Sequence, residues 1–327
     1  MEKTTKTSKF LKSKIFTLIL LLAAIVVFFA IATKGSFLKP LNIRNILNSM
    51  VLVSLLAIGE GMLIIAGNID LSAGAVGTLA GVLLSFLLTT LGLPWPVAVI
   101  GCLVSGALCG LINAFLINEL AFQPFIATLA MSSVAEGLTY VICGALAIPV
   151  KDKVITYVGT GRIFGQIPVS IIISLLALII YGLILAKTKF GRTIYLCGGN
   201  RNAARLAGLN PKKLSYILFM NGGALAALAG GLLAARLKSG TPAGIKTMQF
   251  SGITAAILGG ISFGGGSGGM LGCFIGLLII NGFNNGLTVM GIDPYWQTVA
   301  SGLLLIIALL FDFFSIRSAA RAHGGTH

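Results

Sequence analysis

One stretch of the chain reads Ile46-Leu-Asn-Ser-Met-Val-Leu-Val-Ser-Leu-Leu-Ala-Ile-Gly-Glu-Gly-Met-Leu-Ile-Ile-Ala66, a nearly continuous apolar run. About 20 apolar residues cross the hydrocarbon core of a bilayer as a helix. The run lies in a segment without Lys or Arg between Arg44 and Lys151, and a second such segment separates Lys246 from Arg317. Because a basic side chain in mid-helix costs about 3 kcal/mol on insertion scales, both segments are typical of membrane spans.

The composition of the whole chain supports this interpretation. Of its 327 residues, 57% are hydrophobic and 9% are charged, whereas a soluble globular protein carries about 25% charged residues. The chain lacks the polar surface to cover itself in water, which excludes a soluble enzyme, a disordered chain and a coiled coil. The net charge of +15 comes from 23 basic against 8 acidic residues. Since acids are simply scarce, we read the charge as membrane topology and expect no nucleic-acid partner.

We therefore predict an all-α polytopic membrane protein with about ten transmembrane helices. The first run, Ile15–Thr33, follows a basic segment as a signal peptide would. It is longer than the roughly 7–15 apolar residues of a signal and lacks a convincing cleavage site, so we interpret it as an uncleaved span. The other predicted spans are Ile46–Ala66, Leu71–Leu91, Trp95–Ile117, Pro124–Ile148, Pro168–Ala186, Leu214–Ala235, Met248–Ile261, Met270–Met290 and Tyr295–Phe314.

The placement of basic residues predicts that both termini are cytoplasmic. With the N-terminus inside, 14 Lys and Arg residues fall in cytoplasmic segments and 9, Lys246 among them, fall in external loops, as the positive-inside rule expects. The predicted organisation is a basic N-terminal segment (residues 1–14), a transmembrane domain (15–314) and a cytoplasmic tail (315–327). The transmembrane domain contains a cytoplasmic loop (187–213) that holds seven of the inside positive charges.

Three pairs of short segments resemble each other and keep their order along the chain. The pairs are 67–74 with 259–266, 111–115 with 279–283, and 123–125 with 293–295. Transporters are often built from repeats of a multi-span unit, with the solute path at the repeat interface. The similarities indicate an internal duplication, and coincidence among glycine-rich apolar strings is the alternative.

An acid, an amide and a hydroxyl interrupt two apolar runs in Gly67-Asn68-Ile69-Asp70-Leu71-Ser72-Ala73-Gly74. Intramembrane acids are rare and expensive, so Asp70 is a candidate for the solute path. The alternative is a capping Asp at the start of the next span. Glu60 and Glu136 also lie inside apolar runs, where a structural interhelical hydrogen bond is the favoured interpretation.

Further polar side chains at membrane depth suit the path of a sugar, which needs amides and hydroxyls for hydrogen bonds and aromatic faces for stacking. The candidates are Asn68, Asp70, Ser72, Gln123, Thr128, Asn281, Asn285, Trp296 and Gln297. Polar lining of the seams between helices explains the same residues without transport. The five cysteines show no metal-ligand spacing, and we predict neither a catalytic residue nor a metal site.

The basic loop 187–213 contains the signals of a short helix. Asn200 or Asn202 can cap a helix that runs through Ala207, and Gly208 can end it. Such a helix between two spans is a docking element, and an ordinary positive-inside loop is the alternative. The glycine-rich run 264–269 contains G-x-G-x-x-G, but its flanks are spans, so we reject nucleotide binding there.

Together with other segments, this loop gives the chain a resemblance to a known family. The chain resembles the permease subunits of ribose-type ABC sugar importers over nearly its whole length. The resemblance is carried by Gly67–Gly74, Gln123–Leu129, Thr188–Gly208, Gly259–Gly269 and Asn285–Gln297. Asn202-Ala-Ala204 with Gly208 is similar to the E-A-A-x-x-x-G coupling segment of ABC importers, with Asn202 in place of the usual acid. The resemblance implies contact with an ATPase through Asn200, Asn202, Ala203, Ala204, Arg205 and Gly208.

The resemblance also implies the function, a membrane-spanning permease of an ATP-driven importer in the bacterial plasma (inner) membrane. Its solute would be ribose or a similar sugar. The implied partners are a second permease copy (identical or a close paralogue), cytoplasmic ABC ATPase subunits, and an extracellular or periplasmic sugar-binding protein. The chain itself would carry no cofactor, since ATP and Mg²⁺ would be held by the ATPase. A stand-alone secondary transporter or channel is the alternative, with only Glu60, Asp70 and Glu136 to couple an ion.

Overall fold

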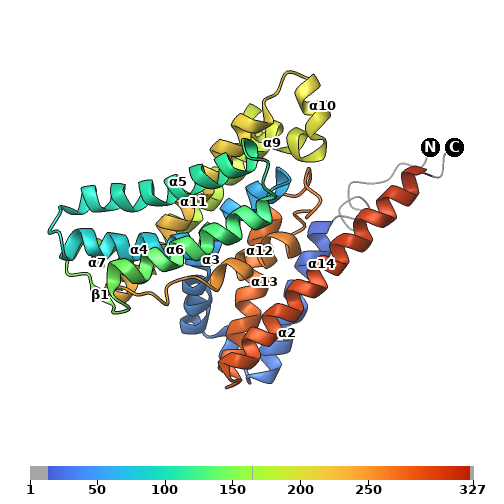
Figure 1. Cartoon of the computed structure of the whole chain (residues 1–327). Coiled ribbons are helices and arrows are strands. Elements are labelled where there is room, and N and C mark those ends of the chain that lie inside the picture. The colour runs from blue at the N-terminus through green and yellow to red at the C-terminus, as the bar shows by residue number, and fades with distance from the viewer. Residues whose placement is uncertain (1–13, 164, 325–327) are drawn as a thin grey trace.

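The computed structural model describes residues 14–163 and 165–324, and helices form most of it (Figure 1). The longer helices are α2 (Lys14–Ala32), α3 (Pro40–Ile65), α4 (Ala73–Thr89), α5 (Trp95–Asn118), α6 (Pro124–Cys143), α8 (Val169–Lys187), α11 (Pro211–Leu237), α13 (Met270–Val289) and α14 (Pro294–Gly324). The shorter helices are η1 (Ser36–Leu38), α7 (Lys153–Thr160), α9 (Lys189–Gly199), α10 (Arg201–Leu206) and α12 (Met248–Leu258).

Among the residues that the structure describes, the strands form two small antiparallel pairs. In the first pair, β1 (Ile148–Pro149) lies against β4 (Ser239–Gly240), and in the second, β2 (Arg162–Ile163) lies against β3 (Ile167–Pro168). Both pairs are in connections between long helices, so they join neighbouring loops and form no layer of the fold.

Seven of the described helices are long and apolar enough to cross a membrane, namely α2, α3, α5, α6, α8, α11 and α13. This confirms the prediction of an all-α polytopic membrane protein. The three other predicted spans coincide with α4, α12 and α14, whose apolar helical portions are shorter. The predicted end of one span near Ile148 was too late, because α6 ends at Cys143, where Gly144 takes a left-handed conformation with φ 57°.

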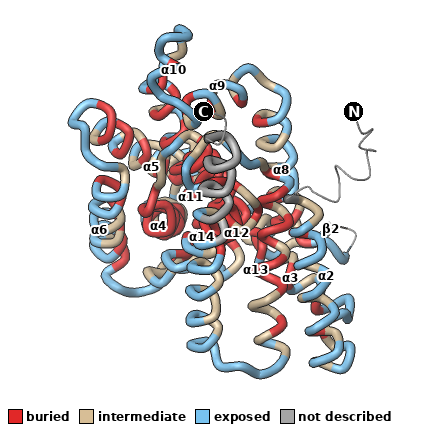
Figure 2. The backbone as a smooth tube through the Cα atoms, turned by 90° about the vertical axis from the view of Figure 1, so that its right-hand side faces the viewer, coloured by how far each residue is buried: buried red, intermediate tan, exposed pale blue. Residues whose placement is uncertain are grey.

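Helix α11 lies in the interior of the bundle, where it packs against α3, α4 and α5. Figure 2 shows the buried residues gathered there, while α10 is largely exposed and α6 has one exposed side. Glycines permit the close approach: a Cβ on Gly230 would lie 1.7 Å from the carbonyl oxygen of Gly77, and one on Gly223 would lie 2.0 Å from that of Gly106. Small residues at such seams are typical of membrane helices, which have no hydrophobic force to drive them together.

Two groups of four helices, α3–α6 and α11–α14, follow the same plan along the chain. In each group the second helix is the shortest, and a proline stands at the start of the first helix and of the fourth. The first helix of each group packs on the second and third helices of the other, so that α11 contacts α4 and α5, and α3 contacts α12 and α13. This reciprocal packing is the arrangement that a duplicated unit would produce.

Two of the three similar segment pairs fit this plan. Asn113 and Asn281 both lie on the third helix of their group, and Pro124 and Pro294 both begin the fourth. The first pair does not fit, because 67–74 leads into α4 whereas 259–266 follows α12. Its similarity reflects two glycine-rich turns at different places in the fold.

The molecule has two distinct ends. Helices α9 and α10, the first turn of α2 and the last turn of α14 lie at one end, and α7 with β1 lies at the other (Figure 1). The predicted N-terminal segment lies almost wholly outside the described residues. Helix α14 continues to Gly324, so most of the predicted tail extends the last helix.

Candidate functional site

The segment between α3 and α4 folds back alongside the last turns of α3. The backbone N–H of Asp70 donates to Glu60 Oε2 at 3.3 Å, although Glu60 lies ten residues earlier. Such a contact is possible only if the chain reverses after Ile65 and returns into the bundle. Unwound backbone at membrane depth is tolerated where it is buried in protein or lines a water-filled cavity.

The carboxylate of Asp70 is held by three donors. The N–H and hydroxyl of Ser72 both donate to Asp70 Oδ1, at 2.8 and 2.5 Å. The side-chain amide of Asn113, on α5, lies 2.9 Å from the Ser72 hydroxyl and 3.5 Å from the same Asp70 oxygen. Ser72, not Asp70, is the N-cap residue of α4. Asp70 is thus not itself the N-cap of α4: its carboxylate closes a turn that precedes the helix and ties this turn to α5.

Glu60, Asp70, Ser72 and Asn113 form a group that we call the buried cluster, and it is closed off from the surface. Glu60 and Asp70 are each 1% exposed, and Ser72 and Asn113 are fully buried. Within the described residues neither carboxyl has an ion-pair partner, and Glu60 Oε1 and Asn113 Oδ1 have no hydrogen-bond partner. The predicted interhelical hydrogen bond of Glu60 is replaced by a bond to the returning backbone. In this conformation a solute has no access to these side chains.

Two further helices fasten the same segment. The hydroxyl of Thr128, in the first turns of α6, accepts from the N–H of Leu71 at 3.0 Å. The side-chain oxygen of Gln249, on α12, accepts from the N–H of Gly74 in the first turn of α4 at 2.8 Å. The start of α4 is thus tied to both α6 and α12, so a movement of either helix would pull on the returning segment.

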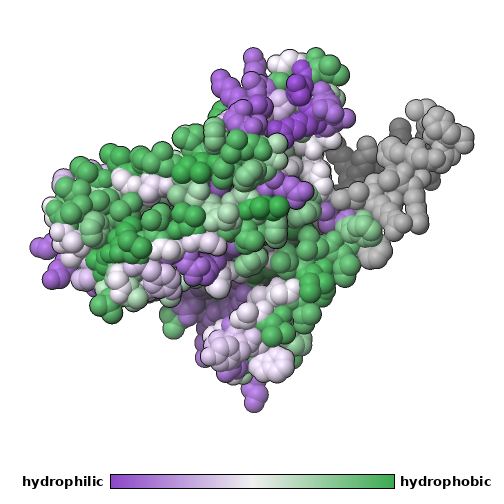
Figure 3. All heavy atoms as spheres, in the orientation of Figure 1, coloured by the Kyte–Doolittle hydropathy of each residue, from purple (hydrophilic) through white to green (hydrophobic). Residues whose placement is uncertain are grey.

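A second polar region lies on the surface of the bundle. Glu136, midway along α6, forms an ion pair with Lys246, just before α12. The two side chains are 37% and 46% exposed. Lys246 had been placed in an external loop, but the segment before α12 enters the bundle, where Ile245 N–H donates to the hydroxyl of Thr78 on α4 at 3.1 Å. Figure 3 shows hydrophilic side chains between α6 and α12, with apolar surface above them.

Polar side chains next to this ion pair on α6 are also exposed at the surface. One turn before and one turn after Glu136, Ser133 and Tyr140 are exposed on the same side of α6. A charged side chain facing hydrocarbon at mid-span costs about 3 kcal/mol. We therefore define Ser133, Glu136, Tyr140 and Lys246 as the polar face, a surface suited to water or a polar partner rather than to lipid.

The short helix predicted in the basic loop is present as α10. Asn200 is its N-cap, with Oδ1 accepting from the N–H groups of Asn202 and Ala203 at 3.0 and 2.9 Å. Gly208 follows the helix with φ 79° and open space around its Cα, a conformation that other residues adopt only with strain. Ala204 is the buried residue of α10, while Leu206 is 91% exposed. Leu206 could not be singled out from the sequence, since no pattern distinguishes a projecting leucine from a packed one in so short a helix.

Helix α9, before α10, packs on the turns that flank the buried cluster. A Cβ on Gly198 would lie 1.7 Å from the carbonyl oxygen of Ile65, the last residue of α3. The hydroxyl of Tyr195 donates to the carbonyl of Gly268 at 2.7 Å, and burial raises the pKa of this hydroxyl.

A second connection runs from α10 into the bundle. Arg201 donates to Asn118 Oδ1 at 3.1 Å, and the amide of Asn118 donates to the hydroxyl of Ser215 on α11 at 2.9 Å. Asn118 ends the same helix, α5, that carries Asn113 of the buried cluster. One rigid helix therefore links α10 with the returning segment.

The other predicted path residues are not gathered around Asp70. Asn281 is buried and donates to the carbonyl of Leu277 on its own helix, and Asn285 accepts from the amide of Asn42 at 2.7 Å. Gln123 is exposed at the start of α6. Trp296, 68% exposed, and Gln297 lie in the first turn of α14. The structure thus joins Asp70, Ser72 and Thr128, with Asn68 on the same segment, and leaves the others apart.

Comparison with known proteins relates this arrangement to a transport family. Residues 42–309 match the family described as branched-chain amino acid transport system / permease component. The chain belongs to this family. It is 37% identical to the ribose import permease protein of Bacillus subtilis, covering 85% of this chain and 86% of the relative. It is 34% identical to the D-allose transport system permease protein of Escherichia coli, covering 89% of each chain. No solved structure matches the chain.

Membership and helices together establish a multi-pass membrane permease. The matched region begins in the first turn of α3 and ends within α14, so it contains the buried cluster, the polar face and α10. The xylose transport system permease protein of Haemophilus influenzae is 29% identical, over 91% of this chain and 96% of the relative. In the described part of the permease, no three His, Cys, Asp or Glu residues are grouped so that they could hold a metal ion.

Proposed function

We propose that this permease is the membrane subunit of an ATP-driven importer of ribose or a similar sugar. The observation that carries the proposal is α10, a capped helix that projects beyond the bundle while its neighbours are anchored to α3 and α5. Relatives named as ribose, allose and xylose permeases support the choice of a sugar. A channel or secondary transporter has no need of such a helix.

The ATPase would dock on α10 from the cytoplasm. Leu206 would insert into its surface, Arg205 and Asn202 would contact its rim, and Asn200, Ala203, Ala204 and Gly208 would maintain the shape of the helix. ATP and Mg²⁺ would stay on the ATPase, and this chain would need no cofactor. A movement of α10 would then pass to the bundle through Arg201 and through the packing of α9 on Ile65.

The solute would cross beside the polar face, between two copies of the permease. Charges at mid-span need water or a polar neighbour, and a second copy that faces the first across α6 and α12 would enclose both. Hydroxyls of a sugar would exchange hydrogen bonds with Glu136, Lys246 and Tyr140, and a binding protein would deliver the sugar at the end that carries α7. The buried cluster would control the shape of the path rather than contact the solute.

The proposed topology has ten spans, with α4, α12 and α14 completing the seven longest helices. Both termini and α10 would be cytoplasmic, consistent with the end of the molecule that α10 shares with the first turn of α2 and the last turn of α14 (Figure 1). The reciprocal packing of α3–α6 with α11–α14 supports an ancient duplication of a four-helix unit.

Uptake of radiolabelled ribose by vesicles containing the permease, its ATPase and its binding protein tests the proposal. Gly208→Arg is expected to abolish uptake with a normal amount of permease in the membrane, because Arg is strained at φ 79° and would disturb the docking helix. Leu206→Asp is expected to reduce uptake and ATPase copurification together. Wild-type uptake by both variants would refute docking at α10, and ATP-independent uptake would refute the importer class.

A further inference from the structure

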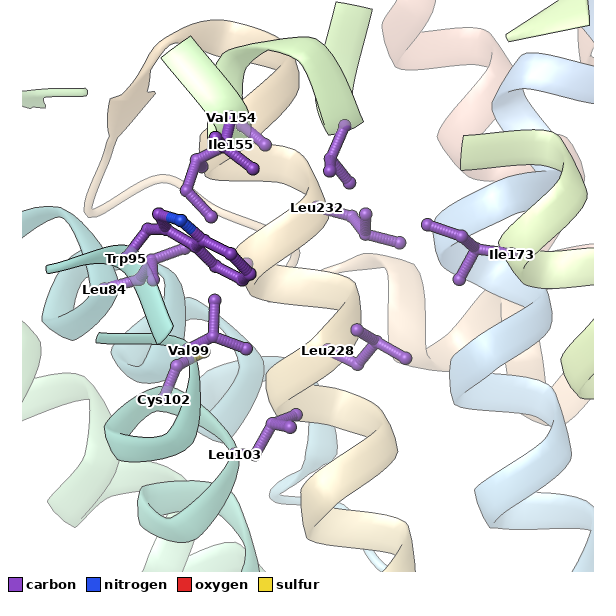
Figure 4. Close-up of a pocket in the computed structure, with 13 residues that line it drawn as sticks. Leu84, Trp95, Val99, Cys102, Leu103, Val154, Ile155, Ile173, Leu228 and Leu232 are labelled. Atoms are coloured by element: carbon purple, nitrogen blue, oxygen red, sulfur yellow. The ribbon is translucent and has the colours of Figure 1, made fainter. Parts of the chain in front are cut away.

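An apolar cavity lies near the end of the molecule opposite to α10. It has a volume of about 190 Å³ and is lined by α4, α5, α7, α8 and α11. Figure 4 shows Trp95, Val99 and Leu103 of α5 on one side of it, Leu228 and Leu232 of α11 behind it, and Ile173 of α8 across from Trp95. Apart from the Trp95 indole and the Cys102 thiol, its lining side chains are hydrocarbon.

The lining excludes the sugar as the occupant, because a sugar would lose its hydrogen bonds to water and gain almost none. The cavity is open on one side, where Trp95 and Val154 are 42% and 43% exposed. Its inner wall contains the buried residues Cys102 and Leu232. An open hydrocarbon cleft on a membrane protein suits a flexible alkyl chain that enters from the bilayer.

Lysines surround the end of the cavity that α7 covers. Lys151 and Lys153 flank the start of α7, immediately before the lining residue Val154, and Lys238 follows α11 close to the lining residue Ala235. All three are exposed, and among the described residues none of them takes part in an ion pair. The acid between the first two, Asp152, has its carboxylate engaged by the N–H groups of Val154 and Ile155 at 2.9 Å.

We propose that this cavity binds one acyl chain of an anionic phospholipid, with the lipid phosphate held among Lys151, Lys153 and Lys238. Lipid tails are as apolar as leucine, so the cavity alone selects no lipid from the bilayer. The cationic rim supplies the selection, because lysines near the membrane surface attract anionic headgroups. The orientation proposed above places this lipid in the outer leaflet, where it joins α5, α7, α8 and α11 on the side that would face the binding protein.

Native mass spectrometry of the purified permease tests this site. The protein is equilibrated with equal amounts of phosphatidylglycerol and phosphatidylcholine of the same acyl chains, and the lipids retained after detergent exchange are counted. The wild type is expected to retain one phosphatidylglycerol per chain in preference to phosphatidylcholine. In Lys151→Gln/Lys153→Gln the preference is expected to fall by about fivefold for each lysine removed.

Gly231→Leu tests the cavity itself. A Cβ at Gly231 would lie 3.4 Å from the Cys102 sulfur and 3.5 Å from Leu84, so the side chain fits at its base and its branches fill the cavity. This variant is expected to lose the retained lipid. Gly182→Leu is the matched control, since its Cβ meets only Met270 at 3.5 Å and Gly182 does not line the cavity.

Lys34→Gln/Lys39→Gln controls for the change in charge, because these lysines are exposed near η1 and away from the cavity. Equal retention by Gly231→Leu and wild type, or an equal loss in both lysine pairs, would overturn the site and indicate general lipid contact. Equal retention of the two lipids by wild type would overturn the headgroup selection. If Gly231→Leu fails to fold, the two lysine pairs still decide the question.

Discussion

Acidic side chains lie at membrane depth in two regions of this permease, and the two regions are built in opposite ways. Glu60 and Asp70 are 1% exposed and bonded to backbone, hydroxyl and amide groups. Glu136 is 37% exposed and paired with Lys246. Glu60 and Asp70 thus accept hydrogen bonds from groups inside the bundle, whereas Glu136 forms an ion pair with a lysine at the surface.

An acid at membrane depth can have a structural role or a role in transport, and its surroundings distinguish the two. A buried carboxylate surrounded by donors fixes backbone, because its removal leaves several polar groups unpaired. An exposed ion pair adds little stability, typically about 0–1 kcal/mol, so its presence at mid-span calls for a function. We therefore propose that the buried cluster maintains the shape of the path and that the polar face contacts the solute.

The largest effect on folding is expected from Asp70→Ala. The change leaves the N–H and hydroxyl of Ser72 without their acceptor, at a cost of about 1–3 kcal/mol for each buried group, while the amide of Asn113 keeps the Ser72 hydroxyl as its acceptor. The yield of monodisperse protein and its midpoint of thermal unfolding are expected to fall sharply. Asp70→Asn keeps one acceptor oxygen and is the control. Normal stability of Asp70→Ala would remove the distinction between the two regions.

Glu136→Ala is expected to act on transport and not on folding. The ion pair is exposed, so thermal stability should change by less than about 1 kcal/mol. Ribose uptake is expected to fall about tenfold, which corresponds to a loss of about 1.4 kcal/mol of solute interaction. Ser133→Ala, one turn away on the same side of α6, is the milder companion. A fall in stability with unchanged uptake per folded molecule would reverse the assignment.

Thr128→Val tests the two regions independently on one helix, because α6 contains both Thr128, which contacts the segment between α3 and α4, and Glu136 of the polar face. Valine keeps the shape but leaves the N–H of Leu71 unpaired, at a cost of about 1–3 kcal/mol. Hydrogen exchange of the 66–72 segment is expected to increase while the polar face is unaffected. Thr139→Val is the control, since Thr139 is buried but bonds only to its own helix at Ala135. Equal exchange in the two variants would contradict the tie between α6 and this segment.

Arg201→Lys is expected to have the smallest effect. The guanidinium contacts Asn118 at a partly buried position, and a lysine would keep the charge but lose the planar donor geometry. Folding should be unchanged, while ATP hydrolysed per sugar transported should rise about twofold, a shift of only about 0.4 kcal/mol. An unchanged ratio in Arg201→Ala as well would exclude this contact from coupling.

Much of the fold could be predicted from sequence. Apolar length located the nine longer helices and α12, because hydrocarbon allows few exceptions to it. Asn200 with Gly208 located α10, because both act on their own neighbours in the chain. Asp70 could be singled out as a candidate because a carboxylate at membrane depth costs free energy. Its partner Asn113 was not assigned to it, since the contact depends on how α5 packs against the returning segment.

The polar face could not be predicted from the sequence either, because it too depends on how distant segments pack together. The positive-inside rule counts charges between spans, and it placed Lys246 in an external loop. The connection before α12 instead enters the bundle, which brings Lys246 to the middle of α6. Hydropathy gives no sign of such an entry, because a short re-entering segment resembles any polar loop.

Thiol labelling tests most directly whether the two regions divide shape from solute contact. Lys246→Cys and Ser72→Cys are each introduced into a permease whose five native cysteines are replaced by alanine, and the assembled transporter is treated with a water-soluble, membrane-impermeant reagent. Cysteine at position 246 is expected to react and to be protected by transported sugar, while cysteine at position 72 stays unmodified. Labelling of position 246 only by a lipid-soluble maleimide, or sugar-sensitive labelling of position 72, would contradict the account.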